Sequence, residues 1–265
     1  MCIRDSYDIT LVPLYVQLGE ASLRDGVNVD EQTIFDYVAK TGNLPKTSAP
    51  TVADYLESFK KVQQPGQEVV HVSLGSKFSS SYQNACIAAK ELEGVYVVDS
   101  CNLSTGHGHV VVQAAIMAEH GLNGAEILEK CNQITPKVRA SFVVDRLDYL
   151  YKGGRCSGVA ALGANLLKLK PCIEVIDGEM KVGKKYRGNF DKVLLNYTQD
   201  KLSGRQIRKD RVFVTHTECA PEVVKAVVNK VKDLYHFDEL HDTLAGSTIT
   251  SHCGPNTLGV LYIEE

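Results

Sequence analysis

Long apolar runs and clustered charges are both missing from this sequence. No apolar stretch approaches the roughly 18 residues of a membrane-spanning helix, and no signal peptide precedes Tyr7. The 29 Lys and Arg residues nearly balance the 32 Asp and Glu residues, which gives a net charge of −3, and like charges do not gather into a block. These absences argue against stable membrane insertion and against nucleic acid or an anionic membrane as the primary partner.

Paired cysteine motifs are missing as well. The sequence has eight cysteines but no Cys-x-x-Cys pair, and several of them have apolar or small neighbours, as Cys86 does. Such cysteines are typical of reduced, buried small hydrophobic residues rather than of metal ligands or redox pairs. We therefore expect a cytoplasmic protein without a metal site or a structural disulfide.

The common catalytic motifs are also missing. The chain has no Gly-x-Ser-x-Gly elbow, no Walker loop and no His-Glu-x-x-His motif. His236 and His241 are spaced wrongly for two ligands on one helical turn, and Gly106 and Gly108 lack the third glycine of a dinucleotide fingerprint. These gaps disfavour an enzyme that holds phosphate groups, and they predict no cofactor.

The pattern that is present alternates short β-branched runs with helical periodicity, which indicates an α/β protein with a parallel sheet in its first half. The boundary between two domains is expected at about residues 146–156, so that residues 1–150 form an N-terminal α/β domain and residues 151–265 a second α/β domain. The expected strands are residues 9–16, 68–73, 95–99, 138–144, 170–176, 211–216, 240–244 and 258–263. The expected helices are residues 51–61, 81–92, 106–119, 189–202 and 221–234, with Thr51 as the cap of the first.

Hydroxyl side chains follow several of these strands, where open α/β sheets bind their ligands. Thr47 and Ser48 precede Pro50, which favours extended geometry at Ala49 and can direct both hydroxyls outward. The serines of residues 76–81 lie between a strand and a helix N-terminus, a place suited to a carboxylate. The alternative for each serine or threonine is a helix cap or a turn.

His252 and Arg155 are ambiguous on their own. His252 fits an ordinary turn histidine, and Arg155, which follows two glycines, fits a surface charge or a C-cap.

Five segments taken together are more informative than any one of them. They are TSAP at residues 47–50, SKFSSSY at 76–82, LDYLYKGGR at 147–155, KLKP at 168–171 and TSHCGP at 250–255. In this order and roughly this spacing they resemble the DegV family of bacterial fatty-acid-binding proteins, and the resemblance runs from about Tyr7 to the end.

The chain departs from the family pattern in two places. In the second segment Gly75, Phe78, Ser80 and Ser81 replace a serine, a leucine, a glycine and a threonine. At the start, six residues stand where family members have a strand and a helix, which together need about sixteen. We therefore expect a truncated or mis-joined start and an N-terminal domain without its usual first strand and helix.

The resemblance implies a two-domain DegV-like fold, with a parallel α/β/α N-terminal domain and a second α/β domain with a mixed sheet. It implies a carrier rather than an enzyme, which binds a long-chain fatty acid such as palmitate or oleate and presents it to a fatty-acid kinase. The carboxylate is expected between the domains and the acyl chain inside the protein. The implied ligand-binding residues are Thr47, Ser48, Ser76, Ser79, Arg155 and His252.

Two other functions stay open at this point. The DegV fold resembles the substrate-binding domain of dihydroxyacetone kinases, so a small-molecule kinase subunit or a hydrolase that uses His252 and Ser79 is one alternative. A purely structural interaction module is the other. The apolar segments at residues 110–117 and 159–169 are candidates for the walls of an acyl tunnel, with ordinary core packing as their alternative.

Overall fold

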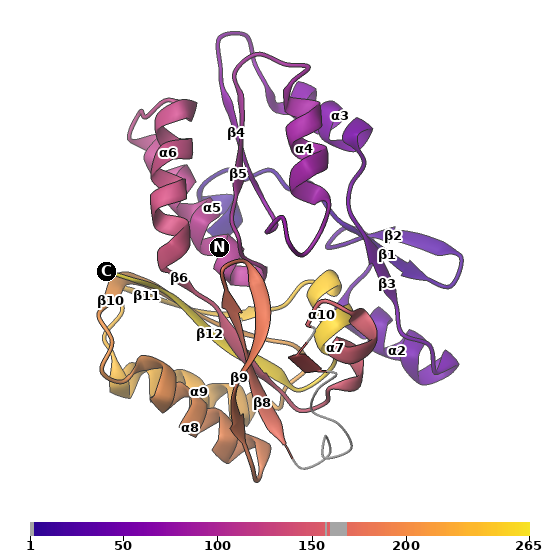
Figure 1. The fold of residues 1–265 in the computed structure, drawn as a ribbon, viewed down its shortest axis with the longest axis vertical. Helices are drawn as coiled ribbons and strands as arrows, with labels where there is room; N and C mark the ends of the chain where they lie inside the picture. Colours follow the sequence, from indigo (N-terminus) through magenta and orange to yellow (C-terminus); the bar gives the residue numbers. More distant parts are fainter. Residues whose placement is uncertain (1–2, 157, 160–168) are drawn as a thin grey trace.

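The computed structural model describes residues 3–156, 158–159 and 169–265. Two α/β units lie one above the other along the long axis of the molecule, with a small third sheet at one side (Figure 1). This arrangement is an α/β fold with a mixed sheet, as the sequence predicted.

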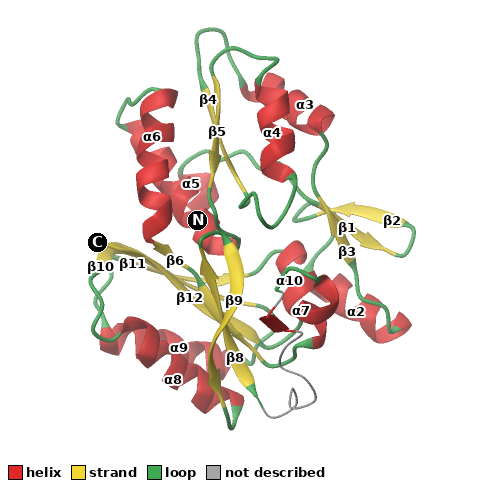
Figure 2. Cartoon of the chain, viewed as in Figure 1, coloured by secondary structure: helices red, strands yellow, loops and turns green. Residues whose placement is uncertain are grey.

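The upper unit is an α/β/α sandwich around two parallel strands. The elements are α3 (Val52–Val62), β4 (Val69–Ser73), α4 (Ser81–Ala89), β5 (Val95–Asp99), α5 (Ser104–Glu119) and α6 (Gly124–Ile134). Alternate strand residues face opposite helical layers. Val95 and Val97 pack with α3 and α4, whereas Val98 packs with α5 and α6. Figure 2 shows the helices on both sides of the strands. The Thr51 cap of α3 is confirmed, because Thr51 and Asp54 form a reciprocal capping box.

The lower unit is a mixed, seven-stranded sheet with the order β11-β10-β12-β7-β8-β9, in which β6 also pairs with β12. Only β10 and β11 run parallel among its described pairs. Two helices, α8 (Phe190–Leu202) and α9 (Pro221–Leu234), cover one face. The strands are β6 (Val138–Arg139), β7 (Ser141–Val144), β8 (Lys170–Ile176), β9 (Glu179–Tyr186), β10 (Ile207–His216), β11 (Glu239–Leu244) and β12 (Thr257–Glu264).

The small third sheet is antiparallel, with the order β2-β1-β3, and it packs against α10. The opposite face of the large sheet carries α7 and α10, which contact each other. The remaining elements are α1 (Ile3–Ser6), β1 (Tyr15–Leu18), β2 (Ala21–Arg24), α2 (Glu31–Thr41), β3 (Lys46–Ser48), the 3-10 turn Thr135–Lys137, α7 (Asp148–Gly153) and α10 (Ser247–Cys253).

Two expected strands were placed wrongly. Within residues 9–16 only Tyr15 and Val16 are in a strand, since Pro13 cannot donate to a ladder, and that strand joins the small antiparallel sheet. Residues 138–144 form two strands, β6 and β7, broken at Ala140, and both lie in the large sheet. An apolar β-branched run fits either sheet, so its sequence does not indicate which strand it will pair with. The expected domain boundary at about residues 146–156 stays a prediction, although the large sheet begins before it.

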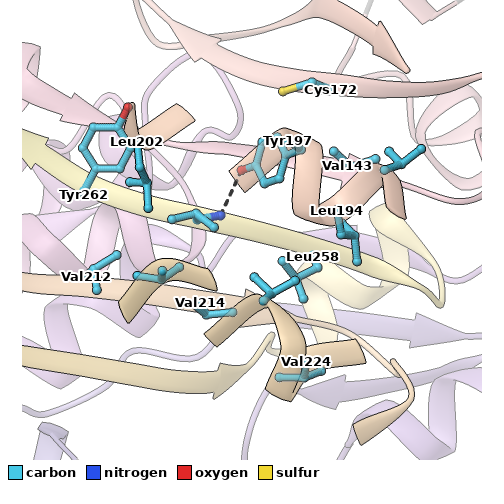
Figure 3. Packing of buried hydrophobic residues seen from close by; sticks show 14 of the residues in the cluster. Val143, Cys172, Leu194, Tyr197, Leu202, Val212, Val214, Val224, Leu258 and Tyr262 are labelled. Carbon is cyan, nitrogen blue, oxygen red and sulfur yellow. Dashed lines mark hydrogen bonds between the residues drawn. The ribbon is translucent and has the colours of Figure 1, made fainter. Parts of the chain in front are cut away.

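Tyr197 joins α8 to the centre of the large sheet through its buried hydroxyl. The hydroxyl donates to the carbonyl of Ser141 at 2.7 Å and accepts the backbone N–H of Val260 at 2.9 Å. Figure 3 marks the second of these bonds with a dashed line among the apolar side chains of the cluster. The hydroxyl therefore satisfies backbone groups of two neighbouring strands in a place without access to water.

We expect Tyr197→Phe to lower the free energy of unfolding by about 2–3 kcal/mol, because it leaves a buried N–H and a buried carbonyl with fewer partners. Urea denaturation measures this change. Tyr151→Phe is the matched control, since Tyr151 is 60% exposed and its change should stay within about 0.5 kcal/mol. Equal stability of the two variants would contradict the role given to the Tyr197 hydroxyl.

Candidate functional site

Thr47 and His252 meet although they lie 205 residues apart: Thr47 Oγ1 and His252 Nε2 are 2.7 Å from each other. Thr47 is the middle residue of β3 and is half-buried, whereas its neighbours Lys46 and Ser48 are exposed. This alternation follows from the two-residue period of a strand. The strand therefore directs the Thr47 hydroxyl inward to α10, which carries His252.

Two consecutive glycines shape the wall beside the imidazole. A Cβ atom on Gly153 would lie 2.5 Å from His252 Nδ1, so no other residue fits there without moving the ring. Gly154 has a left-handed conformation, with φ of 68°, and its N–H donates to the carbonyl of Leu150 to end α7. The first glycine is needed for space and the second for backbone conformation.

Burial lowers the pKa of His252 to about 4, because the charged imidazolium would lose its water, and the nearby Arg155 lowers it further. Its Nδ1 atom is buried without a hydrogen-bond partner among the described residues. His252 is therefore neutral at pH 7 and holds one ring proton.

Arg155 lies close to Gly153 and His252 at the protein surface. Its side chain is exposed, and its Nη1 donates to the carbonyl of Gly153 at 2.7 Å. The guanidinium thus stays close to His252 while it faces solvent.

The serines of residues 76–81 divide between two environments. Ser79 Oγ lies 2.9 Å from Ser81 Oγ and accepts the Ser81 backbone N–H, so Ser79 acts as a cap at the start of α4. Ser80 occupies the N-cap position without a side-chain cap bond. Ser76 does not line the cavity described below: it is exposed, and its backbone N–H donates to the carboxylate of Asp99 at the end of β5.

A cavity of about 260 Å³ connects these groups. Its polar wall comes from β3, the start of α4, Arg155 and α10. Its apolar wall comes from the core that packs on the face of the large sheet opposite α8 and α9. The lining residues are Leu14, Thr47, Ser48, Ala49, Leu74, Phe78, Ser79, Ser80, Leu103, Phe142, Leu150, Arg155, Met180, Thr248, Ile249, His252 and Cys253. One end of the cavity can thus hydrogen-bond a polar group while the rest contacts an apolar one.

The structure brings together Thr47, Ser48, Ser79, Arg155 and His252 of the expected site residues, and it leaves Ser76 outside the cavity.

The expected wall at residues 110–117 is wrong, since Val110, Ala114 and Met117 pack into a separate core with α6 and β5. Most of the expected wall at residues 159–169 falls outside the described residues. The apolar lining from Phe142, Leu150 and Met180 was missed, because it comes from three elements whose mutual packing the sequence does not indicate.

The described part of the chain shows neither a candidate metal site nor a candidate membrane-spanning helix. No group of three His, Cys, Asp or Glu side chains there could hold a metal ion. None of the described helices is long and apolar enough to cross a membrane.

The chain is similar, along almost its whole length, to DegV family proteins and fatty-acid-binding proteins. The family model described as "Uncharacterised protein, DegV family" matches residues 3–265. A curated Thermotoga maritima protein named "Fatty acid-binding protein" is 31% identical, over 96% of this chain and 90% of its own length. A Thermus thermophilus DegV family structure, described by its fatty acid binding, is 28% identical with a TM-score of 0.87, covering 99% of this chain and 94% of its own. A stearic acid-binding protein from Eubacterium ventriosum is 26% identical with a TM-score of 0.83, covering 99% and 93%.

Buried neutral histidines predict that the protein loses stability in mild acid. Burial lowers the pKa of His252 and His109 to about 4 and that of His71 to about 3. In the unfolded chain these groups take up protons near pH 6.5. The free energy of unfolding should therefore be highest above pH 6.5 and fall as the pH drops from 6.5 to about 4.

The slope of unfolding free energy against pH, measured at pH 5–5.5, gives the number of protons that the chain takes up on unfolding. His252→Gln should reduce that number by about one. An unchanged slope in His252→Gln would show that His252 is protonated in the folded protein.

Proposed function

The chain belongs to the DegV family, and from that premise we propose that it binds one long-chain fatty acid with its carboxylate at Thr47 and His252. The acyl chain then lies along the apolar wall formed by residues such as Phe142, Leu150 and Met180. The observation that carries this proposal is the Thr47–His252 hydrogen bond at the polar end of a mostly apolar cavity.

The hydrogen-bonding pattern of His252 suits a carboxylate ligand. A neutral imidazole has one N–H, and its proton belongs on Nε2, because a proton on Nδ1 would be buried without an acceptor. Nε2–H then donates to Thr47 Oγ1, which leaves the Thr47 hydroxyl proton free to donate to the carboxylate. The N-terminus of α4 near Ser79 adds favourable partial positive charge.

The apolar wall supplies most of the binding free energy in this proposal. Transfer of about 15 methylenes from water contributes on the order of 12 kcal/mol, at roughly 0.8 kcal/mol each. Loss of translational freedom and ordering of the chain oppose binding by a comparable amount, about 4–15 kcal/mol. A preformed cavity therefore matters, because it reduces the ordering that binding requires.

We further propose that the bound acid is presented to a fatty-acid kinase. A carboxylate oxygen would form a bond to the phosphorus of the kinase's phosphoryl donor, while the bond from that phosphorus to its leaving group breaks. Hydroxyl and N–H donors leave more electron density on the oxygen than a bidentate arginine would. Arg155 supports this role, since it is exposed beside the polar end and free of ion pairs among the described residues.

The hydrolase alternative has less support. A serine nucleophile needs a hydrogen bond to its base, but Ser79 Oγ contacts Ser81, and His252 Nε2 contacts Thr47. The described residues thus show no Ser79–His252 pair.

Purified protein should carry one fatty acid per chain, or bind one palmitate or oleate per chain when added. Organic extraction with mass spectrometry and isothermal titration measure this. Thr47→Ala should weaken binding by about 1–3 kcal/mol, because a buried donor to the carboxylate is lost.

Two variants control this prediction. Thr47→Ser retains the hydroxyl and should bind nearly as well as the unaltered protein, and Ser76→Ala should have no effect because Ser76 lies outside the cavity. Protein that is repeatedly empty and binds no added acid would refute the function. Normal affinity in Thr47→Ala would move the carboxylate elsewhere.

Arg155→Ala should retain fatty acid affinity but form acyl phosphate at least about tenfold more slowly with a cognate kinase. Lys152→Ala is the matched control, since Lys152 is an exposed cation on α7 that does not line the cavity. Loss of affinity in Arg155→Ala without a separate kinetic defect would show that Arg155 holds the bound acid, and would remove the docking role.

A further inference from the structure

Helix α10 carries much of the polar end of the cavity, but it begins without a cap of its own. Thr248, Ile249, His252 and Cys253 all line the cavity from this seven-residue helix. Gly246 occupies its N-cap position and has no side chain to accept the first N–H groups. The position of α10 therefore depends on a group from elsewhere in the chain.

Asp25 supplies that group. Its Oδ1 accepts the N–H of Ser247 at 2.8 Å, and its Oδ2 accepts the N–H of Thr248 at 2.8 Å. The contact leaves little free space, since a Cβ atom on Gly246 would lie 3.2 Å from Asp25 Oδ2. Both oxygens of one carboxylate are thus engaged by the start of α10.

Asp25 is itself fixed to the small sheet. Its backbone N–H donates to the carbonyl of Leu14 at 2.9 Å, and it forms a bridge to Val29. The hydroxyl of Ser247 returns a bond to the Val29 carbonyl at 3.1 Å. The loop that carries Asp25 and the helix that carries His252 are therefore joined by several short hydrogen bonds.

The same small sheet carries Thr47. Strand β1, which follows Leu14, pairs with β3 so that Val16 lies opposite Thr47. Asp25 thus connects α10, which carries His252, to the small sheet, which carries Thr47, the hydrogen-bond partner of His252. A shift of α10 on the small sheet would change the distance between Thr47 and His252.

We propose that Asp25 is a positioning residue that holds α10 on the small sheet and so sets the Thr47–His252 hydrogen bond at the polar end of the cavity. This inference rests on the proposed function only for the choice of ligand in its test. Asp25 does not line the cavity, so any effect on binding reaches the ligand through α10.

The test compares Asp25→Ala and Asp25→Asn with Asn189→Ala. Asn189 caps α8 by accepting the N–H of Asp191 at 2.9 Å, and α8 packs on the core of the sheet face opposite the one that lines the cavity. Asn189→Ala should therefore lower stability as a lost cap does without affecting the cavity. Asp25→Asn keeps one acceptor oxygen and is the variant to use if Asp25→Ala does not fold.

Two readouts are needed: palmitate affinity, and the imidazole 15N resonances of His252 in ligand-free protein, which report its hydrogen bond to Thr47. Asp25→Ala should bind palmitate about tenfold more weakly and shift the His252 resonances. Asp25→Asn should change both readouts less in the same direction. Asn189→Ala should change neither.

Unchanged His252 resonances in both Asp25 variants would overturn the inference, whatever their affinity, because the cap would then be structural only. Shifted resonances with unchanged palmitate affinity would support the positioning role and place the carboxylate away from the Thr47–His252 hydrogen bond. If the unaltered protein binds no fatty acid, the proposed function fails, and the resonances of the ligand-free variants alone still decide whether Asp25 positions His252.

Discussion

The hydrogen bond between Thr47 and His252 joins the small antiparallel sheet to the helix that lies over the large sheet, and the polar end of the cavity depends on it. Three features of the chain maintain it. Strand alternation turns Thr47 inward, Gly153 leaves room for the imidazole, and Asp25 accepts the first N–H groups of α10. None of these groups is close to the others in sequence, so the site exists only once the small sheet has docked on α10.

The large sheet supports the site by having two different faces. Alternate residues of β10, such as Val212 and Val214, pack under α8 and α9, whereas Phe213 packs into the core on the face that carries the cavity. The first face is stabilised by close packing and by the buried Tyr197 hydroxyl. The second face offers a mostly apolar wall, and its polar end has the neutral His252 with the Arg155 cation beside it. That combination suits a ligand with a long hydrocarbon chain and one anionic group, because the chain needs area and the carboxylate needs donors.

Local signals in the sequence predicted part of the local structure. The bounds of β5 and α9 matched, and the Thr51–Asp54 capping box marked the start of α3. Pairing between distant segments was not predictable, as β6 and β7 show, since a β-branched run carries no signal for its partner strand. At the site, Thr47 and His252 were predicted only through the resemblance to a family, because each alone fits a cap or a turn. Ser76 fitted the same motif but faces solvent, and nothing in the sequence near Asp25 indicates that it caps a helix 222 residues away.

A crystal structure of the protein with bound palmitate would show where the carboxylate and the acyl chain lie. We expect a carboxylate oxygen about 2.6–3.0 Å from Thr47 Oγ1, the Thr47–His252 bond retained, and the acyl chain against Phe142, Leu150 and Met180. A carboxylate bound away from Thr47, or an acyl chain that does not contact this apolar wall, would contradict this expectation.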